Sequence, residues 1–459
     1  MRFFKYLQKG KQLNSETKLS KLLDMYKENA GDALGNNQEN LNRRKKIDKT
    51  CSYKIKNSHP EEIQVILDAL IAVMPAAVVS LNCYTEAIKK LQSNFIKNPS
   101  EEKFVKLSFY LGLFKRKHPG PILLKNLIDL YSNSFIEKIS SIDFAIICTA
   151  TFKASVQNKN VKFLNRLINE VIDTSEIDSE VFIAFIKSLR QNKINSPVVL
   201  KKLKSLSNEN KLQNLDYKSL VHIFPIIADN LIKDDKLSKV IVDTCLKTFD
   251  DQTRSKDIQK LLYSCSMINY NMKQSDLKNL ESNVILRTQL KEFHQRFDNF
   301  VDIALSMWML NYKSHGLIQH LFFEKRFHEF SANPDRVKID SRKKLLKTCV
   351  EIERPNWIKD SNKPTKPSFD ENRVSPTYLI RPSIQKVLED FQKCETSIVH
   401  QIKNLNIAGI LVKEADGSNL HVEVLDSTNA MSDNTPNGLL SLKLRLLKHL
   451  NCKVHVVCD

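Results

Sequence analysis

The residues of this chain that could do chemistry lie within its last fifty positions. Two carboxylates, Asp416 and Glu423, fall in a stretch whose pattern predicts a strand, a turn and a second strand. Paired carboxylates can hold a divalent metal ion, and a lysine beside them can orient water or neutralise a phosphate. This region is therefore a candidate for phosphodiester cleavage. The simpler interpretation is that Asp416 makes the turn and Glu423 faces solvent from its strand.

A second group of candidates is basic. Four of its members lie on one predicted helix and the fifth directly follows the first predicted strand: Lys443, Arg445, Lys448, His449 and Lys413. Lys and Arg contact phosphates, and these contacts supply the main sequence-independent part of RNA affinity. The alternative is an ordinary solvated helix face opposite Leu440, Leu444 and Leu447.

Periodicity predicts the elements that must position these residues. Ile407–Val412 is apolar, residues 416–419 form a turn signal, and Leu420–Leu425 alternates with period two, as in a hairpin. Leu439–Leu450 has helical spacing, and Lys453–Cys458 alternates again. Because roughly 300 residues of helical pattern precede this segment, it is predicted to be a small α/β module at the end of a helical array.

The spacing of apolar residues in 61–354 predicts helical hairpins that repeat about every 37–40 residues. The apolar anchors of the first helices are Phe104, Phe144, Phe182, Val221 and Ile258. The anchors of the second helices are Leu124, Leu164, Leu200, Val240 and Leu277. A single hairpin cannot bury its apolar face, so the hairpins are predicted to stack into a solenoid. Helix pairs of similar length in any all-α protein are the alternative.

The fold class predicted is therefore mainly α, with a small C-terminal α/β module. Residues 1–60 are polar, rich in Asn and Lys, and are predicted to be a flexible leader. Residues 355–383 contain five prolines and are predicted to be a linker. The module spans 384–459, and residues 383–403 are predicted to form one more helix leading into it.

Composition restricts the classes of function. The net charge of +19, from 71 basic and 52 acidic residues, favours a nucleic acid or an anionic membrane as partner. A Lys-rich compositional bias would also produce this excess, and the chain would then be a protein-interaction scaffold. Glycine is rare (9 residues), which disfavours glycine-rich phosphate loops. The longest apolar stretch, Val65–Leu81, contains Asp68 and Pro75 and predicts core helices rather than a membrane span.

Cysteine and histidine spacing predicts no metal site. The nine cysteines include no Cys-x-x-Cys pair, and no histidine pair has zinc-ligand spacing. The cysteines are predicted to be buried, reduced thiols of an intracellular protein. No cofactor is predicted.

The N-terminus carries two competing targeting signals. Its first acidic residue is Glu16, and before it stand four basic residues: Arg2, Lys5, Lys9 and Lys11. With Phe3 and Leu7 on one helical face, this pattern is similar to a mitochondrial presequence. Residues 43–46, Arg-Arg-Lys-Lys, could instead be a nuclear signal.

Three internal segments and the C-terminal module resemble the FAST-kinase-domain-containing proteins. LLYSCSMINYNM (261–272) and ALSMWMLNYKSHGLIQHLFFEKRF (304–327) are similar to the family's first leucine-rich subdomain. LLKTCVEIERPNW (345–357) is similar to the second, which centres on a Glu-x-Pro-like element. GILVKEADGSNLHVEVLDSTNAMSDNTPNGLLSLKLRLLKHLNCKVHVV (409–457) resembles the RAP module that ends those proteins. The FAST-like part covers about residues 254–354, and the upstream repeat resembles octotricopeptide-type hairpins.

The resemblance implies a mitochondrial matrix protein that binds organellar transcripts. It also implies a restriction-endonuclease-like fold for the RAP module, in which Asp/Glu-x-Lys supplies catalytic groups. Here Leu425 stands two residues after Glu423, where the lysine would be. Arg445 matches a basic position of the family's RAP helix. Kinase chemistry is not predicted, because the sequence has no G-x-G-x-x-G, His-Arg-Asp or Asp-Phe-Gly motif.

Four aromatic residues on the predicted helices could stack on bases: Trp308, Tyr312, Tyr263 and Tyr270. Trp308 is predicted to fill the core instead. Together with these patterns, the resemblance implies a non-catalytic protein that binds mitochondrial RNA and acts in its processing, stability or translation, beside other RNA-processing proteins. The alternatives are a metal-dependent RNA endonuclease using Asp416 and Glu423, and a scaffold without RNA binding.

Overall fold

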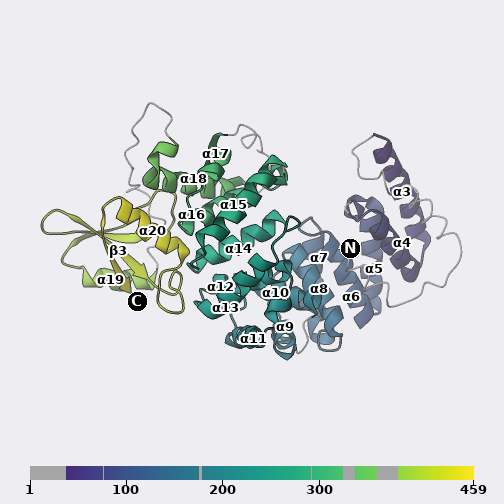
Figure 1. The fold of residues 1–459 in the computed structure, drawn as a ribbon. Helices are drawn as coiled ribbons and strands as arrows, with labels where there is room; N and C mark the ends of the chain where they lie inside the picture. The colour runs from purple at the N-terminus through teal and green to yellow at the C-terminus, as the bar shows by residue number, and fades with distance from the viewer. Residues whose placement is uncertain (1–37, 76, 175–177, 291, 324–335, 359–380) are drawn as a thin grey trace. The chain divides into compact units, whose positions relative to one another are not determined.

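The computed structural model describes residues 38–459 except 76, 175–177, 291, 324–335 and 359–380. The described chain is mainly helical and ends in a small sheet of four strands (Figure 1). This confirms the predicted mainly α class with a small C-terminal α/β part. The predicted N-terminal targeting signal at residues 2–16 lies outside the described residues, as does most of the predicted linker.

The α-helices of the described chain, in order, are α3 (Gln38–Asn57), α4 (Pro60–Val73), α5 (Asn82–Lys97), α6 (Glu101–Leu113), α7 (Gly120–Phe135), α8 (Ser141–Ala154), α9 (Val161–Asp173), α10 (Ser179–Gln191), α11 (Pro197–Asn208), α12 (Tyr217–Asp229), α13 (Asp235–Lys247), α14 (Ser255–Met267), α15 (Gln274–Gln289), α16 (Phe297–Met309), α17 (His315–Phe323), α18 (Arg336–Glu353), α19 (Pro382–Asp390) and α20 (Gly438–His449). The strands are β1 (Glu395–Val399), β2 (Gly409–Lys413), β3 (Asn419–Leu425) and β4 (Lys453–Cys458).

Six consecutive helix pairs, from α6–α7 to α16–α17, have a regular spacing along the chain. Their first helices begin at residues 101, 141, 179, 217, 255 and 297. One or two residues after each first helix, the backbone adopts the left-handed conformation that ends a helix. These residues are Lys115, Ser155, Lys193, Leu231, Asn269 and Asn311. Every pair therefore ends its first helix with the same left-handed turn, and the pairs follow one another at intervals close to the predicted repeat length.

The chain forms two compact units. The first comprises residues 1–170 and 187–193 and the second comprises 171–186 and 194–459. In the first unit, α3 packs on α5, and α6 packs on both α7 and α8. In the second unit, α12, α14, α16 and α18 pack on one another in succession. The sheet belongs to the second unit, so the C-terminal module is not a separate compact body.

The sheet has the strand order β1-β2-β3-β4. β1, β2 and β3 run antiparallel in sequence, and β4 pairs with β3 in parallel. A parallel pair needs a crossover connection, and α20 supplies it between β3 and β4. The two predicted strands at 420–425 and 453–458, and the helix at 439–450, are confirmed within one residue.

Both faces of the sheet are covered, which explains why β3 is buried along most of its length. On one face, Ile384 and Val387 of α19 pack with Ile410, Val422 and Val424. Side chains alternate across a strand, so His421 and Glu423 lie on the opposite face, toward α20. The sheet is therefore the middle of three layers.

Three sequence predictions about secondary structure and packing were wrong. Residues 383–403 do not form one helix, because α19 ends at Asp390 and β1 pairs with β2. Residues 38–57 of the predicted leader form α3. Its Asp48 accepts hydrogen bonds from the backbone N–H groups of Asn82 and Cys83 at the start of α5, which anchor the helix.

The third error concerns the register of the second helices. The first-helix anchors are all buried, but only Leu124 and Leu277 of the second-helix anchors are. The other three, which are only partly buried, are Leu164, Leu200 and Val240. Their neighbours Phe163 and Val199 take the core positions in α9 and α11.

No helix in the described part of the chain is both long enough and apolar enough to cross a membrane. Six of the nine cysteines are buried, namely Cys51, Cys83, Cys148, Cys245, Cys265 and Cys349. All nine are free thiols. Cys394 and Cys458 are exposed and Cys452 is partly buried, so the prediction that all nine are buried was wrong for these three.

Candidate nucleic-acid interface

The two carboxylates proposed as a metal pair are not brought together. Asp416 lies in the exposed β2–β3 turn, where it accepts a hydrogen bond from the backbone N–H of Ser418. Hydrogen bonding with the Ser418 side chain, and secondly with its backbone, lowers the pKa of Asp416. Glu423 lies four residues inside β3, on the α20 side, and its side chain is buried. Among the described residues, no three His, Cys, Asp or Glu side chains group to hold a metal ion. The structure therefore does not bring Asp416 and Glu423 together as a metal-binding pair.

Glu423 is paired with Lys443, which was predicted to contact RNA. The Nζ atom of Lys443 lies 2.7 Å from Oε2 of Glu423 and donates a further hydrogen bond to the Ile407 carbonyl at 3.0 Å. The side chains of Lys443 and Glu423 are 0% and 1% exposed. Lys443 therefore does not contact a phosphate in this arrangement, and Glu423 does not face solvent. The cation that is missing at Leu425 comes instead from α20.

Burial moves both members of this pair toward their neutral forms. It lowers the pKa of Lys443 and raises the pKa of Glu423, while each partner's charge acts in the opposite direction. His421 lies on the same face of β3, and burial together with the charge of Lys443 lowers its pKa. His421 is therefore a neutral neighbour of the pair near pH 7.

A glutamine completes the polar cluster under α20. The side chain of Gln401 is buried, and neither its Oε1 nor its Nε2 has a hydrogen-bond partner in the described chain. A Cβ added to Gly409 would lie 2.4 Å from Nε2 of Gln401 and 2.6 Å from Oε1 of Glu423. The absence of a side chain at Gly409 thus lets the amide and the carboxylate converge. An unpartnered buried amide is costly, so the cluster is a candidate polar site.

Arg445 points out of the module toward the helical array. Its guanidinium donates hydrogen bonds to Glu353 at 2.9 Å and to the Trp308 carbonyl at 2.7 Å. Glu353 also accepts a bond from Nε1 of Trp308 at 2.6 Å, and its carboxylate lies 3.3 Å from Lys313. The Glu353 side chain is fully buried. It is the common acceptor that joins Arg445 of α20 to Trp308 and Lys313 of the helical array, and we call this group of contacts the clamp. The prediction that Arg445 contacts RNA is therefore replaced by a docking role.

The start of α20 makes a second set of contacts with the array. A Cβ added to Gly438 would lie 1.8 Å from the Ser266 carbonyl, so only glycine permits this approach to α14. Asn269 donates hydrogen bonds to the Pro436 carbonyl and to Ser441 Oγ, both at 2.7 Å. Asn269 is one of the left-handed residues of the helix pairs. The repeated turn is thus used directly as a docking surface for the module.

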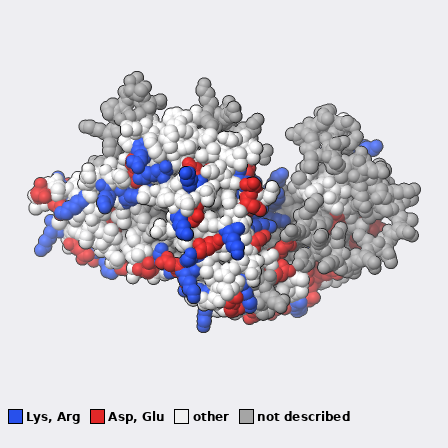
Figure 2. Space-filling view, viewed as in Figure 1, with Lys and Arg blue, Asp and Glu red and all other residues white. Residues whose placement is uncertain are grey.

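The remaining predicted basic residues do not form one face. Lys448 and His449 are both exposed, and Nε2 of His449 lies 3.4 Å from the Glu353 carboxylate. Lys413 is exposed and pairs with Glu395 across β1 and β2. Figure 2 shows Lys and Arg interspersed with Asp and Glu on the visible face. Lys448 and Lys413 therefore remain accessible for phosphate contacts.

Three of the four aromatic candidates are buried or donate hydrogen bonds to other side chains of the protein. Trp308 is 1% exposed, which confirms the prediction that it fills the core. The Tyr312 hydroxyl donates a hydrogen bond to Glu281, and the Tyr263 hydroxyl donates one to Asp229 at 3.2 Å. Tyr270 is only partly buried.

Sequence reasoning missed the roles of Lys443, Glu353 and Gln401. A signal for Lys443 was present, because it lies three residues after Leu440 and four before Leu447, on the buried face of the helix. No sequence signal points to Gln401, since its neighbours Glu423 and Gly409 are brought to it only by the sheet.

Compared with known protein families and with curated proteins, the chain matches none at a significant level.

Proposed function

We propose that this chain is a non-catalytic RNA-binding protein of the mitochondrial matrix. In this proposal it takes part in the processing, stability or translation of mitochondrial RNA, together with other RNA-processing proteins. The observation that carries the proposal is the charge of +19, from 71 basic and 52 acidic residues. A basic excess of this size attracts the phosphate backbone.

The arrangement of the resembling segments supports the family hypothesis. Asn269 lies in the first segment, Trp308 in the second and Glu353 in the third, and each contacts the C-terminal module. Segments that are far apart in the sequence thus meet at one interface. If the resembling segments have a common architecture, they are expected to meet at one interface in this way.

The finer description of the fold belongs to the same proposal. The six regularly spaced helix pairs are what a helical-repeat solenoid would contain. The C-terminal part contains the predicted strand, turn, strand, crossover helix and strand, preceded by α19 and β1. We therefore propose residues 61–354 as the solenoid and residues 384–459 as the RAP-like module.

The experiment that tests RNA binding is crosslinking in cells followed by sequencing of the recovered RNA. The proposal expects mitochondrial transcripts to be enriched over a mock purification. Recovery of no RNA above background would reject the proposed function and favour the scaffold alternative.

One observation favours a second candidate function, RNA cleavage by the module. Lys443 supplies a cation beside Glu423, and Gln401 adds an unpartnered amide. Such groups could serve phosphodiester chemistry if the cluster opened to solvent. The test is incubation of labelled RNA with the purified protein and magnesium or manganese. We expect no cleavage. Metal-dependent cleavage that is lost in Glu423→Gln and in Lys443→Met, under conditions in which unfolding measurements show both variants still folded, would establish the enzyme instead.

A further inference from the structure

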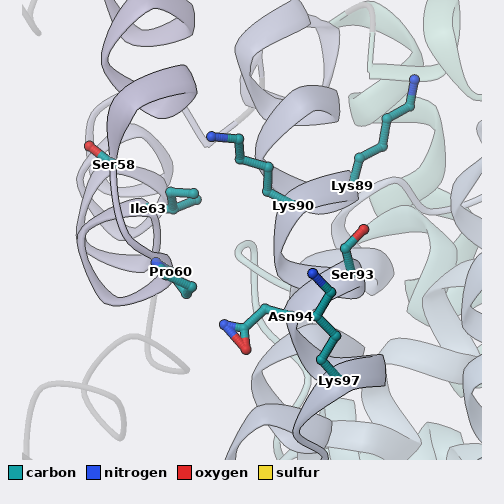
Figure 3. A pocket seen from close by; sticks show the side chains of 8 residues that line it. All are labelled: Ser58, Pro60, Ile63, Lys89, Lys90, Ser93, Asn94 and Lys97. Carbon is teal, nitrogen blue, oxygen red and sulfur yellow. The ribbon is translucent and has the colours of Figure 1, made fainter.

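A groove in the first unit offers a binding surface that lies outside the C-terminal module. Its volume is about 460 Å³, and it lies between α5 and the start of α4 (Figure 3). One wall carries Lys89, Lys90 and Lys97, together with Ser93 and Asn94, all on α5. The opposite wall includes Pro60, the first residue of α4. We propose that this groove binds the sugar–phosphate backbone of single-stranded RNA; this inference rests on the proposed function.

The charge of the groove favours an anionic ligand. Three of its lining residues are lysines and none is acidic. Glu61 and Glu62 lie on the first turn of α4 but do not line the groove. The backbone N–H groups at the start of α4 add partial positive charge to the same side. Ser93 and Asn94 supply uncharged hydrogen-bond donors between the lysines.

The three lysines have different roles. Lys90 donates hydrogen bonds to the carbonyls of Ile55 at 2.8 Å and Lys56 at 2.6 Å, so it holds the end of α3. Figure 3 shows Lys90 directed across the groove, toward the wall that carries Ser58 and Pro60, Lys97 directed toward Asn94, and Lys89 directed away from that wall at the rim. Lys89 and Lys97 are exposed and have no ion pair or hydrogen bond with the described residues. Their ammonium groups are therefore free to bind a ligand that lies along α5.

The spacing and composition of the wall favour a strand of backbone over a single nucleotide. Lys89 and Lys97 are eight residues apart, which places them about 12 Å apart along the helix axis. No aromatic side chain lines the groove, so no base can stack in it. Binding by phosphate contacts alone is independent of sequence. The groove would therefore raise the affinity for RNA and orient the bound strand. Any recognition of the RNA sequence would take place elsewhere on the protein.

The test compares two variants of the full-length protein that remove the same charge. Lys89→Gln with Lys97→Gln alters the groove, whereas Lys117→Gln with Lys159→Gln alters two exposed lysines of the same unit outside it. Affinity for a single-stranded RNA is measured across a series of salt concentrations. Each phosphate contact contributes about 0.7 to the slope of log K against log salt, so the groove variant should lose about 1.4. Its affinity should fall roughly tenfold at physiological salt, with little change in the control.

A second readout uses the wild-type protein and needs no variant to fold. Bound RNA should protect Lys89 and Lys97 from acetylation, while Lys117 and Lys159 react as before. If both variants bind RNA with the same slope of log K against log salt, and RNA does not selectively protect Lys89 and Lys97, the groove does not bind RNA. The proposed function would then still stand. No RNA binding by the wild-type protein would overturn the proposed function itself and the groove with it.

Discussion

Lys443 on α20 and Glu423 on β3 form an ion pair that is closed off from solvent, with Nζ of the lysine 2.7 Å from Oε2 of the glutamate. This pair joins the crossover helix to the centre of the sheet. Removing one partner leaves an uncompensated buried charge, which is expensive in a low-dielectric interior. The pair therefore governs whether the module folds, and it places Lys443 out of reach of RNA.

The first prediction is a non-additive effect of substitutions in this pair. Lys443→Met and Glu423→Leu should each lower the free energy of unfolding by about 3–5 kcal/mol, because each leaves one charge alone. The double variant should recover most of this loss. Denaturant unfolding of the four proteins measures the coupling, and additive losses would contradict a direct buried pair.

The second prediction concerns the clamp between Glu353 and Arg445. Glu353→Ala should destabilise the second unit by about 3–5 kcal/mol, since it leaves Arg445, Lys313 and Trp308 without their common acceptor. Arg445→Ala should cost less, because Glu353 keeps Lys313 and Trp308. Hydrogen exchange of α20 and β4, followed by mass spectrometry, measures the loosening. The reverse order of effects would show that Glu353 is not the centre of the clamp.

The third prediction concerns Lys260, whose side chain is 19% exposed and lies 3.1 Å from Asp257. Burial lowers its pKa from 10.5 to about 8. Between these values the unfolded chain binds more protons than the folded chain, so stability rises with pH. Relative to Lys260→Met, the wild-type protein should gain roughly 3 kcal/mol between pH 8 and 10.5 and should change little below pH 8. Asp257 keeps Arg254 as a partner in the variant.

Paired unfolding measurements across this pH range test the prediction. Lys260→Arg is the matched control, because arginine stays charged throughout and should show no such gain. A constant difference between the wild-type protein and Lys260→Met would mean that Lys260 keeps its ordinary pKa.

The fourth prediction concerns location. Residues 1–40 carry four basic residues before the first acidic one, Glu16. Fused to a fluorescent protein, this segment should enter mitochondria. A fusion in which the four basic residues are replaced by Gln is the control and should stay outside. Nuclear or diffuse signal from the full-length protein would reject the proposed location.

The sequence predicted those elements whose pattern is local. Leu420–Leu425 alternates with period two, and it forms β3 because one set of side chains meets α19 and the other meets α20. Residues 395–399 were missed because only a short turn separates them from α19, and only pairing with β2 makes them a strand. The apolar anchors predicted the helix pairs. In three second helices, however, the residue predicted to be buried is only partly buried, and in α9 and α11 its neighbour takes the core position.

The candidate site was less predictable, because its contacts join distant parts of the chain. Lys443 and Arg445 are two residues apart on one helix, and so they point in different directions. One enters the module and the other reaches Glu353, which is 92 residues away. Sequence alone grouped them as one basic face. Their opposite roles follow from which acidic residue each helix face meets in the folded protein.

Equilibrium binding of the full-length protein to a labelled single-stranded mitochondrial RNA, measured from low to physiological salt, tests the central claim most directly. If several phosphates are neutralised, affinity should fall at least about tenfold across this range, because binding releases counterions from the RNA and this release becomes less favourable as the salt concentration rises. Salt-independent binding, or no binding to such RNA at low salt, would contradict the account and favour a protein-interaction scaffold.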